Sequence, residues 1–360
     1  MRILQSLPEV QKNILLKNYA TFKIGGEAKY FFVAKTKKDL ILAITVAKKL
    51  KIPFFILGGG SNLLASDQGY KGLVIKIKNE KFKIKNYNSK LKIFCEAGAP
   101  LSKLLSESFK NGVTGLEWAA GIPGTVGGAV WGNAGAFGKS MRDIIKEVEV
   151  FDTKTEEMSV FKNKDCQFGY RDSIFKKNKN LIITFLTLKL KKGKKKEIQK
   201  KIKEYLNYKK EKQPLNYPSA GSIFKNLPRT ETEFLVRGQK SPKQNKFATG
   251  QAKIKNRASI YGSEGEEENG VLFAYQNLLK KYPEFKKFNK IGEIPVGWLI
   301  DKCGLKGKKI GEAQISKIHA NFIVNRNRAK AKDVKKLINL MKKKVKQKFG
   351  LVLKEEIEYL

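Results

Sequence analysis

The segment best suited to ligand chemistry is a run of small residues that follows a short apolar stretch. Residues 54–57 are apolar and lead directly into Gly58, Gly59, Gly60, Ser61 and Asn62. Because glycine has no Cβ atom, the backbone N–H groups of this run can approach a phosphate closely, and the serine and asparagine side chains add hydrogen bonds. The run predicts a phosphate-binding loop, and an ordinary tight turn is the alternative interpretation.

A second glycine-rich segment, residues 121–135, offers the same close approach of backbone to ligand. Its candidate ligand-binding residues are Gly121, Pro123, Gly124, Thr125, Gly127, Gly128, Asn133 and Gly135. Two such loops favour a diphosphate. No Gly-x-Gly-x-x-Gly follows a predicted strand, which argues against a Rossmann cofactor site. The sequence Gly138-Lys139-Ser140 ends like a P-loop, but Asn133 replaces the required earlier glycine, so we exclude a nucleotide triphosphatase.

An arginine with an aromatic neighbour is the first candidate for substrate chemistry. Tyr170 and Arg171 stand together within residues 169–173. A guanidinium group matches two oxygens of a carboxylate or phosphate at once, so Arg171 is suited to an anionic substrate. A surface ion pair between Arg171 and Asp172, or another acid, is the alternative interpretation.

A serine among small residues is the second candidate. Ser222 lies within residues 217–226 in a predicted tight turn, but the Gly-x-Ser-x-Gly of a hydrolase nucleophile is absent. A Ser-His-Asp hydrolase would also need His319, the single histidine, which precedes an apolar stretch at 320–324. We therefore interpret Ser222 as a proton donor rather than a nucleophile.

Three acidic residues stand close together at the end of the sequence. We predict a short strand over 354–358, in which Glu356 and Glu358 share one face and Glu355 points to the other. By position alone, all three are interpreted as surface charges.

Length and composition indicate a globular protein with a sizeable core. At roughly 100 to 200 residues per domain, the chain of 360 residues should form two or three domains. No apolar run approaches the roughly 18 residues that cross a bilayer, and residues 1–22 lack a signal-peptide core, so we expect a cytoplasmic protein without membrane insertion. Cys95, Cys166 and Cys303 show no metal-ligand spacing and are odd in number, so we expect buried thiols without disulfides or zinc.

The formal net charge of +41 is typical of proteins that bind nucleic acid. However, only eight of the 74 basic residues are arginines, and the lysines are spread from end to end. Groove-reading proteins favour the bidentate arginine, so we expect no specific nucleic-acid partner. A lysine-rich nucleic-acid-binding protein is the non-enzyme alternative. The charge would still attract small anionic substrates.

Hydrophobic periodicity predicts the elements that position these candidates. The predicted strands are 28–33, 54–57, 73–77, 145–152 and 181–190. The predicted helices are 38–50, 102–111, 197–212 and 331–349. In the last helix one apolar stripe contains Val334, Leu337, Ile338, Met341 and Val345. Residues 227–290 are polar and weakly periodic apart from a helix at 271–279, and we interpret them as a partly disordered insertion.

Taken together and in this order, the motifs resemble the family of UDP-N-acetylmuramate dehydrogenases, also called UDP-N-acetylenolpyruvoylglucosamine reductases. The resemblance covers nearly the whole chain outside 227–290, with landmarks at 18–26, 57–63, 116–138, 169–175, 219–226, 297–301, 304–313 and 319–325, and at the end from Lys346. It implies an α+β protein with a two-part FAD-binding unit of the vanillyl-alcohol-oxidase (PCMH) type, followed by an α+β substrate-binding domain. The implied domains are two FAD-binding subdomains, 1–78 and 79–212, a substrate-binding domain, 213–354, with the insertion 227–290, and a tail, 355–360.

The resemblance also implies residue roles. Arg171, Ser222 and Glu356 match the family's catalytic residues. Substrate-contacting positions are matched by Tyr170, Lys212 and Asn226, and less closely by His319. The two glycine loops would hold FAD, which NADPH reduces and whose N5 atom delivers hydride to the methylene carbon of an enolpyruvyl ether. Arg171 and Glu356 would stabilise the negative charge that develops, and Ser222 would donate the final proton. An ionised Glu356 would repel that charge, so it must be protonated or closely paired with a cation.

The implied partners are small molecules, namely an anionic UDP-sugar substrate and NADPH, and we expect a monomer. The alternative enzyme is another FAD-dependent oxidoreductase of the same fold, such as a small-alcohol or sugar oxidase. Such oxidases often attach the flavin covalently through histidine, and His319 lies in the wrong domain for that attachment.

Overall fold

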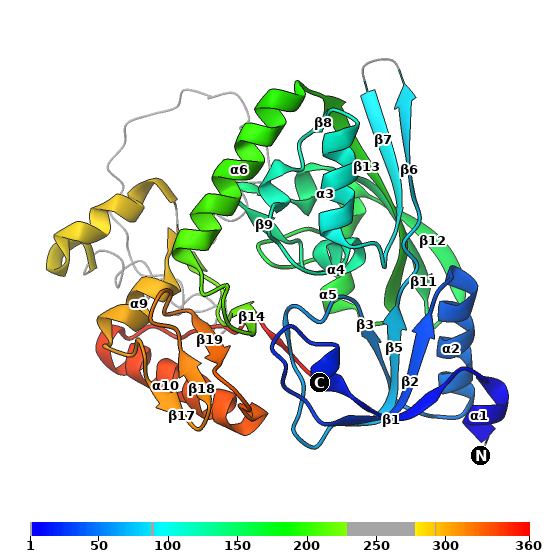
Figure 1. Ribbon diagram of the computed structural model, residues 1–360, viewed down its shortest axis with the longest axis horizontal. Coiled ribbons are helices and arrows are strands. Elements are labelled where there is room, and N and C mark those ends of the chain that lie inside the picture. The colour runs from blue at the N-terminus through cyan, green and yellow to red at the C-terminus, as the bar shows by residue number, and fades with distance from the viewer. Residues whose placement is uncertain (1, 88–89, 229–277, 292) are drawn as a thin grey trace, which may run out of the picture. The chain divides into compact units, whose positions relative to one another are not determined.

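The protein is described by a computed structural model, shown in Figure 1, that covers residues 2–87, 90–228, 278–291 and 293–360. It divides into two compact units. The first unit combines residues up to 223 with 306–338 and 356–360, and the second combines described residues of 224–305 with 339–355. Most of the predicted insertion and of the predicted helix 271–279 lies outside the described residues. The domain limits at 78, 212 and 354 remain predictions.

The first sheet leads into the first glycine loop. Its strand order is β1 (Gln11–Leu15), β2 (Glu27–Ala34), β5 (Tyr70–Ile77) and β3 (Phe54–Leu57). The last three strands are parallel, and β1 is antiparallel to β2. The helix α2 (Lys37–Lys49) begins at the capping box formed by Thr36 and Asp39 and buries its apolar side in one core with β2 and β5. The predicted strands and helix of this segment are therefore confirmed, and β3 ends directly before Gly58.

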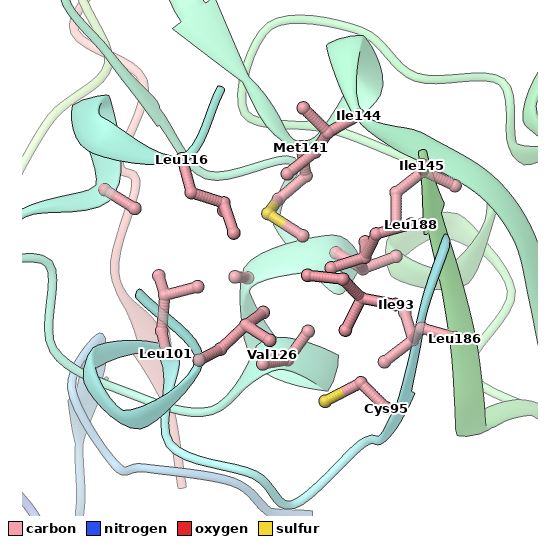
Figure 2. Close-up of a cluster of buried hydrophobic side chains, with 14 of the residues drawn as sticks. Ile93, Cys95, Leu101, Leu116, Val126, Met141, Ile144, Ile145, Leu186 and Leu188 are labelled. Atoms are coloured by element: carbon pink, nitrogen blue, oxygen red, sulfur yellow. The ribbon is translucent and has the colours of Figure 1, made fainter. Parts of the chain in front are cut away.

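The second sheet is antiparallel, with the order β12 (Glu157–Lys162), β11 (Ile145–Asp152), β13 (Leu181–Lys192), β7 (Lys90–Glu96) and β6 (Phe82–Tyr87). The short β8 (Val113–Thr114) also pairs with β13. Figure 2 shows the core on this sheet, where side chains of β7 and β13 meet Leu101 of α3 (Leu101–Lys110) and Val126 of α4 (Val126–Trp131). The partly buried Ile202 and Tyr205 of the helix α6 (Lys195–Lys212) pack on the same core, and Ile198 of this helix is also buried.

The third sheet carries Ser222. Its antiparallel order is β14 (Ser219–Ser222), β19 (Phe322–Asn325), β18 (Ala313–Ile315) and β17 (Lys309–Ile310). The long helix α10 (Ala331–Phe349) follows, and its predicted apolar stripe is confirmed because all five of its residues are buried. In the described part of the chain, none of the helices combines the length and apolar content needed to cross a membrane.

The second unit is built around aromatic side chains. It contains β15 (Leu227–Pro228), paired with β16 (Glu293–Ile294), and the helix α9 (Val296–Lys302) after the 3-10 segment η5 (Pro283–Ile291). The ring of Trp298 lies 4.8 Å from that of Phe285 and 5.2 Å from that of Tyr282, measured between centroids. The buried residues of α9 are Val296, Leu299 and Ile300.

The remaining elements are short and include α1 (Arg2–Ser6), α5 (Ile174–Lys177) and the hairpin of β9 (Gly135–Ala136) with β10 (Lys139–Ser140). The 3-10 turns of the first unit are η1 (Leu16–Asn18), η2 (Glu117–Ala119), η3 (Met141–Asp143) and η4 (Asn163–Cys166).

Two expectations from the sequence are wrong. The predicted strand 354–358 does not form as one element, because only Glu355 makes an isolated bridge and the strand β20 begins later, at Glu358–Tyr359. The reason is that β20 pairs in parallel with β4 (Leu63–Leu64), a partner far away in sequence. Cys95 and Cys166 are buried as expected, whereas Cys303 is only partly buried.

Candidate functional site

The two glycine-rich loops pack directly against each other in the first unit. A Cβ atom at Gly59 would lie 2.4 Å from the Cα atom of Gly124, which is closer than real Cβ contacts allow. The side chain of Ser61 reaches the same loop, where its hydroxyl donates to the carbonyl of Pro123 at 3.3 Å. The glycines are therefore needed where backbone meets backbone, and the juxtaposed loops fit the diphosphate of a dinucleotide such as FAD.

The first loop is held by a threonine that the sequence analysis did not single out. Thr21 donates its N–H to the carbonyl of Gly60 at 3.0 Å, and its hydroxyl donates to the carbonyl of Ser219 at 2.8 Å. Gly60 has a φ of +63°, and a Cβ there would lie 2.1 Å from the Tyr19 carbonyl oxygen. Thr21 thereby connects the glycine loop to the strand of Ser222. Its position inside the landmark 18–26 was the only available signal.

Several residues of the second loop have structural partners. Thr125 caps α4 by accepting from the N–H of Gly128 at 3.2 Å. Gly127 donates its N–H to the carbonyl of Ala97, and a Cβ at this glycine would lie 2.7 Å from the Cβ of Ala97. These contacts fix the shape of the loop, and the roles of Gly127, Gly128 and Thr125 in cofactor binding stay predictions.

Asn133 links the second loop to the turn that carries Arg171. Its side-chain amide donates to the carbonyl of Gly169 at 2.7 Å, and its side-chain oxygen accepts from the N–H of Arg142 at 3.0 Å. Its neighbour Gly135 accepts from Arg171 through its carbonyl at 2.9 Å. The predicted cofactor residues Asn133 and Gly135 thus also support the arginine.

Arg171 forms an ion pair with Glu356. The Nε atom of Arg171 lies 2.8 Å from Oε1 of Glu356, and both side chains are largely buried, at 25% and 19% exposure. The backbone of Arg171 has a φ of +53°, an uncommon conformation for a non-glycine residue that is concentrated at functional sites. The ring of Tyr170 lies 5.3 Å from the guanidinium carbon. Asp172 pairs with Lys177 at 3.2 Å. The alternative of an ion pair with Asp172 or another acid therefore holds in its second form, with Glu356 as the acid, although this pair is largely buried and not on the surface.

The backbone of Glu356 reaches the strand of Ser222 and the first glycine loop. Its N–H donates to the carbonyl of Ile223 at 2.8 Å, and its carbonyl accepts from the side-chain amide of Asn62 at 2.8 Å. Ser222 is partly buried, and no hydrogen bond of its hydroxyl is found among the described residues. The first unit therefore brings together both glycine loops, the turn of Arg171, Glu356 and the strand that ends at Ser222.

The three acidic residues of the final segment have different partners. Glu356 pairs with Arg171, Glu358 pairs with Lys176 at 2.8 Å, and Glu355 pairs with Lys342 in the second unit. The interpretation of all three as plain surface charges is wrong, because each is partly shielded and ion-paired. Of these three acids, Glu356 is the one that pairs with Arg171, the predicted catalytic arginine.

Among the lysines of α6, the sequence singled out Lys212, which is exposed. Lys209 is buried instead, with 6% exposure, and donates to the carbonyl of Ala120 at 2.5 Å. Burial first, and repulsion from Arg171 second, lower the pKa of Lys209 to about 8. In the sequence, the helical spacing of Ile198, Ile202 and Tyr205 continues to Lys209. This pattern could have indicated that Lys209 lies on the packed side of the helix.

A partly buried lysine contacts the start of the first loop. Lys76, in β5, donates its amine to the carbonyl of Gly58. Burial lowers the pKa of Lys76, and the charge of Glu80 opposes that change. No motif marked this residue in the sequence.

The two remaining predicted substrate residues have local partners. Asn226 lies in the second unit, where its amide donates to Glu293 at 3.0 Å and its side-chain oxygen accepts from the N–H of Val296 at 3.1 Å. His319, in the first unit, accepts from the N–H of Asn321 through Nδ1 at 3.2 Å. Burial lowers the pKa of His319, and Lys306 adds to that effect. Roles of Asn226, His319 and Lys212 in substrate binding stay predictions.

Comparison with known proteins agrees with this arrangement. The family model described as the FAD binding domain matches residues 28–160, and the model described as the C-terminal domain of UDP-N-acetylenolpyruvoylglucosamine reductase matches residues 213–360. The UDP-N-acetylenolpyruvoylglucosamine reductase of Caldanaerobacter subterraneus subsp. tengcongensis is 35% identical over 95% of this chain and 91% of its own length. The enzyme of that name from Caldicellulosiruptor bescii is 36% identical over 98% of this chain and 91% of its own.

A solved structure gives the same result. The crystal structure of UDP-N-acetylenolpyruvylglucosamine reductase from Thermus caldophilus has a TM-score of 0.67 and 30% sequence identity, and the match covers 97% of this chain and 98% of that one. The predicted fold class, an FAD-binding unit of the vanillyl-alcohol-oxidase type followed by an α+β substrate-binding domain, is confirmed, and the protein is an FAD-dependent oxidoreductase. The chain belongs to the UDP-N-acetylenolpyruvoylglucosamine reductase family.

Proposed function

We propose that the protein reduces UDP-N-acetylglucosamine enolpyruvate to UDP-N-acetylmuramate, with NADPH as the hydride donor. The observation that carries the proposal is the largely buried ion pair of Arg171 and Glu356, which joins the glycine loops to the strand of Ser222. Bound FAD supplies a two-electron carrier between NADPH and the substrate. Residues of the loops 58–62 and 121–135 would hold it.

Arg171 supplies the positive charge that the reaction needs. Hydride addition to the methylene carbon of the enolpyruvyl ether leaves negative charge on the neighbouring carbon and its carboxylate. A preorganised cation at this point is worth a few kcal/mol in the transition state, about 3 kcal/mol per contact. The carbonyl of Gly135 and the carboxylate of Glu356 hold two nitrogens of the guanidinium, so little reorganisation is required during the reaction.

Glu356 was expected to be either protonated or closely paired with a cation, and it is paired with Arg171. An ionised carboxylate would oppose the developing negative charge unless a cation accompanies it, and Arg171 is that cation. Glu356 thereby orients the guanidinium, and the pair acts as one unit in the proposal.

Ser222 would complete the reaction. Its hydroxyl gives a proton to the carbon that neighbours the reduced methylene, and the serine then recovers a proton from water. The position of Ser222 beside the backbone contact of Ile223 with Glu356 supports this role. Proton donation by a positioned side chain is typically worth about a hundredfold to ten-thousandfold in rate.

The proposed partners and pathway follow from this reaction. The substrate carries a diphosphate and a carboxylate, and NADPH is also anionic, so the net charge of +41 favours their approach. The product is a peptidoglycan precursor, which places the proposed activity in cell-wall synthesis in the cytoplasm. We propose a monomer as the active form.

Anaerobic NADPH consumption tests the proposed function. The purified yellow protein should oxidise NADPH in step with added UDP-N-acetylglucosamine enolpyruvate, one equivalent for each substrate molecule. UDP-N-acetylglucosamine, which lacks the enolpyruvyl group, is the matched control and should give no sustained turnover. NADPH oxidation that is indifferent to the enolpyruvyl substrate would reject the assignment, and turnover of an alcohol or sugar with oxygen would favour the oxidase alternative.

A further inference from the structure

The side chain of Asn62 faces the segment of Glu356 as well as belonging to the first glycine loop. Its Nδ2 atom lies 2.8 Å from the carbonyl oxygen of Glu356, so the amide donates there. The carbonyl of Asn62 accepts from the N–H of Glu358 at 2.8 Å. One residue therefore holds the final segment on both sides of the buried Ile357.

The orientation of this amide follows from its partner. A backbone carbonyl only accepts hydrogen bonds, so the NH₂ group of Asn62 must face Glu356. The remaining side-chain atom, Oδ1, is itself an acceptor and is unsuited to the oxygens of a phosphate. The side chain is thus poorly matched to the role that its place in the loop suggests, while the backbone N–H of Asn62 is unaffected by this argument.

The contacts around Asn62 continue along the strands. Directly after Asn62, Leu63 and Leu64 of β4 pair with Glu358 and Tyr359 of β20. The N–H of Leu360 then donates to the carbonyl of Leu64 at 3.2 Å. Consecutive hydrogen bonds therefore fix the register of the backbone between Glu356 and Leu360 relative to the end of the glycine loop.

Glu356 also has a fixed partner on its other side. Its N–H donates to Ile223, next to Ser222, and its carboxylate pairs with Arg171. If the hydrogen bond from Asn62 were lost, the carbonyl of Glu356 would no longer be held by this side chain of the cofactor loop. The carboxylate could then shift relative to Arg171.

We propose that Asn62 is a positioning residue for Glu356, which sets the Arg171–Glu356 pair relative to the cofactor loop through the hydrogen bond to the Glu356 carbonyl. This inference rests on the proposed function, because it assigns Asn62 to the step that uses Glu356. It distinguishes Asn62 from its neighbour Ser61, whose hydroxyl donates to the carbonyl of Pro123 in the second glycine loop.

The test compares three quantities for the FAD-loaded enzyme and for Asn62→Ala. They are the FAD dissociation constant, the anaerobic rate of flavin reduction by NADPH, and the rate at which UDP-N-acetylglucosamine enolpyruvate reoxidises the reduced flavin. Loss of one hydrogen bond of about 1 to 1.5 kcal/mol should slow reoxidation about tenfold at saturating substrate, with FAD affinity and flavin reduction changed by less than about threefold. Asn62→Asp, which keeps the shape but turns an oxygen toward the carbonyl, should slow the same step at least as much.

A double-mutant cycle separates positioning from general destabilisation. In the Glu356→Gln background, Asn62→Ala should slow reoxidation by less than about twofold more, because both changes act through one group. Independent structural damage would multiply the two losses. Asn111→Ala is the matched control, since Asn111 also donates its side-chain amide to a carbonyl, that of Glu107 at 2.8 Å, but at the C-terminal end of α3. It should leave all three quantities unchanged.

Each result decides one question. A large rise in the FAD dissociation constant of Asn62→Ala, with reduction and reoxidation slowed equally, would assign the side chain to the cofactor and overturn the proposal. An unchanged reoxidation rate would overturn it as well. If reduced wild-type enzyme is not reoxidised by the enolpyruvyl substrate, the proposed function fails and the positioning role fails with it.

Discussion

The guanidinium of Arg171 and the carboxylate of Glu356 meet at 2.8 Å, although the two residues are far apart in the sequence. The arginine holds this position with a left-handed backbone, and its second contact is the carbonyl of Gly135 in the second glycine loop. The pair thus connects the predicted cofactor loops with the final segment of the chain. This contact supports the proposal that Arg171 and Glu356 act together on the negative charge that develops on the substrate during reduction.

Arg171→Lys should slow reoxidation of reduced flavin by the substrate about a hundredfold or more. A lysine ammonium cannot serve Glu356 and the Gly135 carbonyl with two fixed nitrogens, and removing one preorganised donor costs about this much. The measurement is stopped-flow absorbance of the flavin after mixing with UDP-N-acetylglucosamine enolpyruvate. Arg328→Lys, at an exposed position, is the control and should behave like the wild type. Equal rates for both variants would remove Arg171 from the proposed mechanism.

Ser222→Ala should leave flavin reduction by NADPH nearly intact and slow the second half-reaction about a hundredfold to ten-thousandfold. The reason is that only the second step needs a proton at carbon. Anaerobic single-turnover absorbance measures the two steps separately. Ser219→Ala changes a hydroxyl on the same strand and should affect neither step strongly. Equal loss of both steps in Ser222→Ala would show that the residue is structural.

Gly59→Ala should abolish stoichiometric FAD binding. The added Cβ would lie 2.4 Å from the Cα of Gly124, so the two loops must separate. The ratio of flavin absorbance to protein absorbance after purification measures the effect. Gly132→Ala is the matched control, because the nearest atom to its Cβ lies 3.7 Å away, in ordinary contact. A fully yellow Gly59→Ala protein would contradict the close packing of the loops.

Lys209→Met should remove a pH-dependent contribution to stability. The folded-state pKa of Lys209 is lowered to about 8 from 10.5, so between these values the unfolded chain binds more protons than the folded protein. Stability therefore rises with pH in that window, by up to about 3 kcal/mol from this residue. Urea unfolding at the two ends of the window measures the rise.

The exposed Lys212 supplies the control for that experiment. Lys212→Met should keep the rise in stability with pH, whereas Lys209→Met should lose it. The same rise in both variants would mean that Lys209 is not the group responsible.

Local pattern was sufficient for much of the fold. The predicted helix 331–349 has the bounds of α10, and the predicted strand 54–57 has those of β3, because apolar spacing and burial agree within each element. The final strand was predicted wrongly because its pairing partner, β4, is remote in sequence. Likewise, helical spacing reaches both Lys209 and Lys212, and packing against Ala120 decides that Lys209 is the buried one.

By itself, the sequence determined the glycine loops, the order of the motifs and the family that they resemble, because these depend on residue type and local spacing. Tertiary structure decided which acid meets Arg171 and why the two loops require glycine. It also decided that the amide of Asn62 faces Glu356. The physical reason is that hydrogen bonds and ion pairs between distant segments depend on how strands and loops are brought together, which local periodicity does not encode.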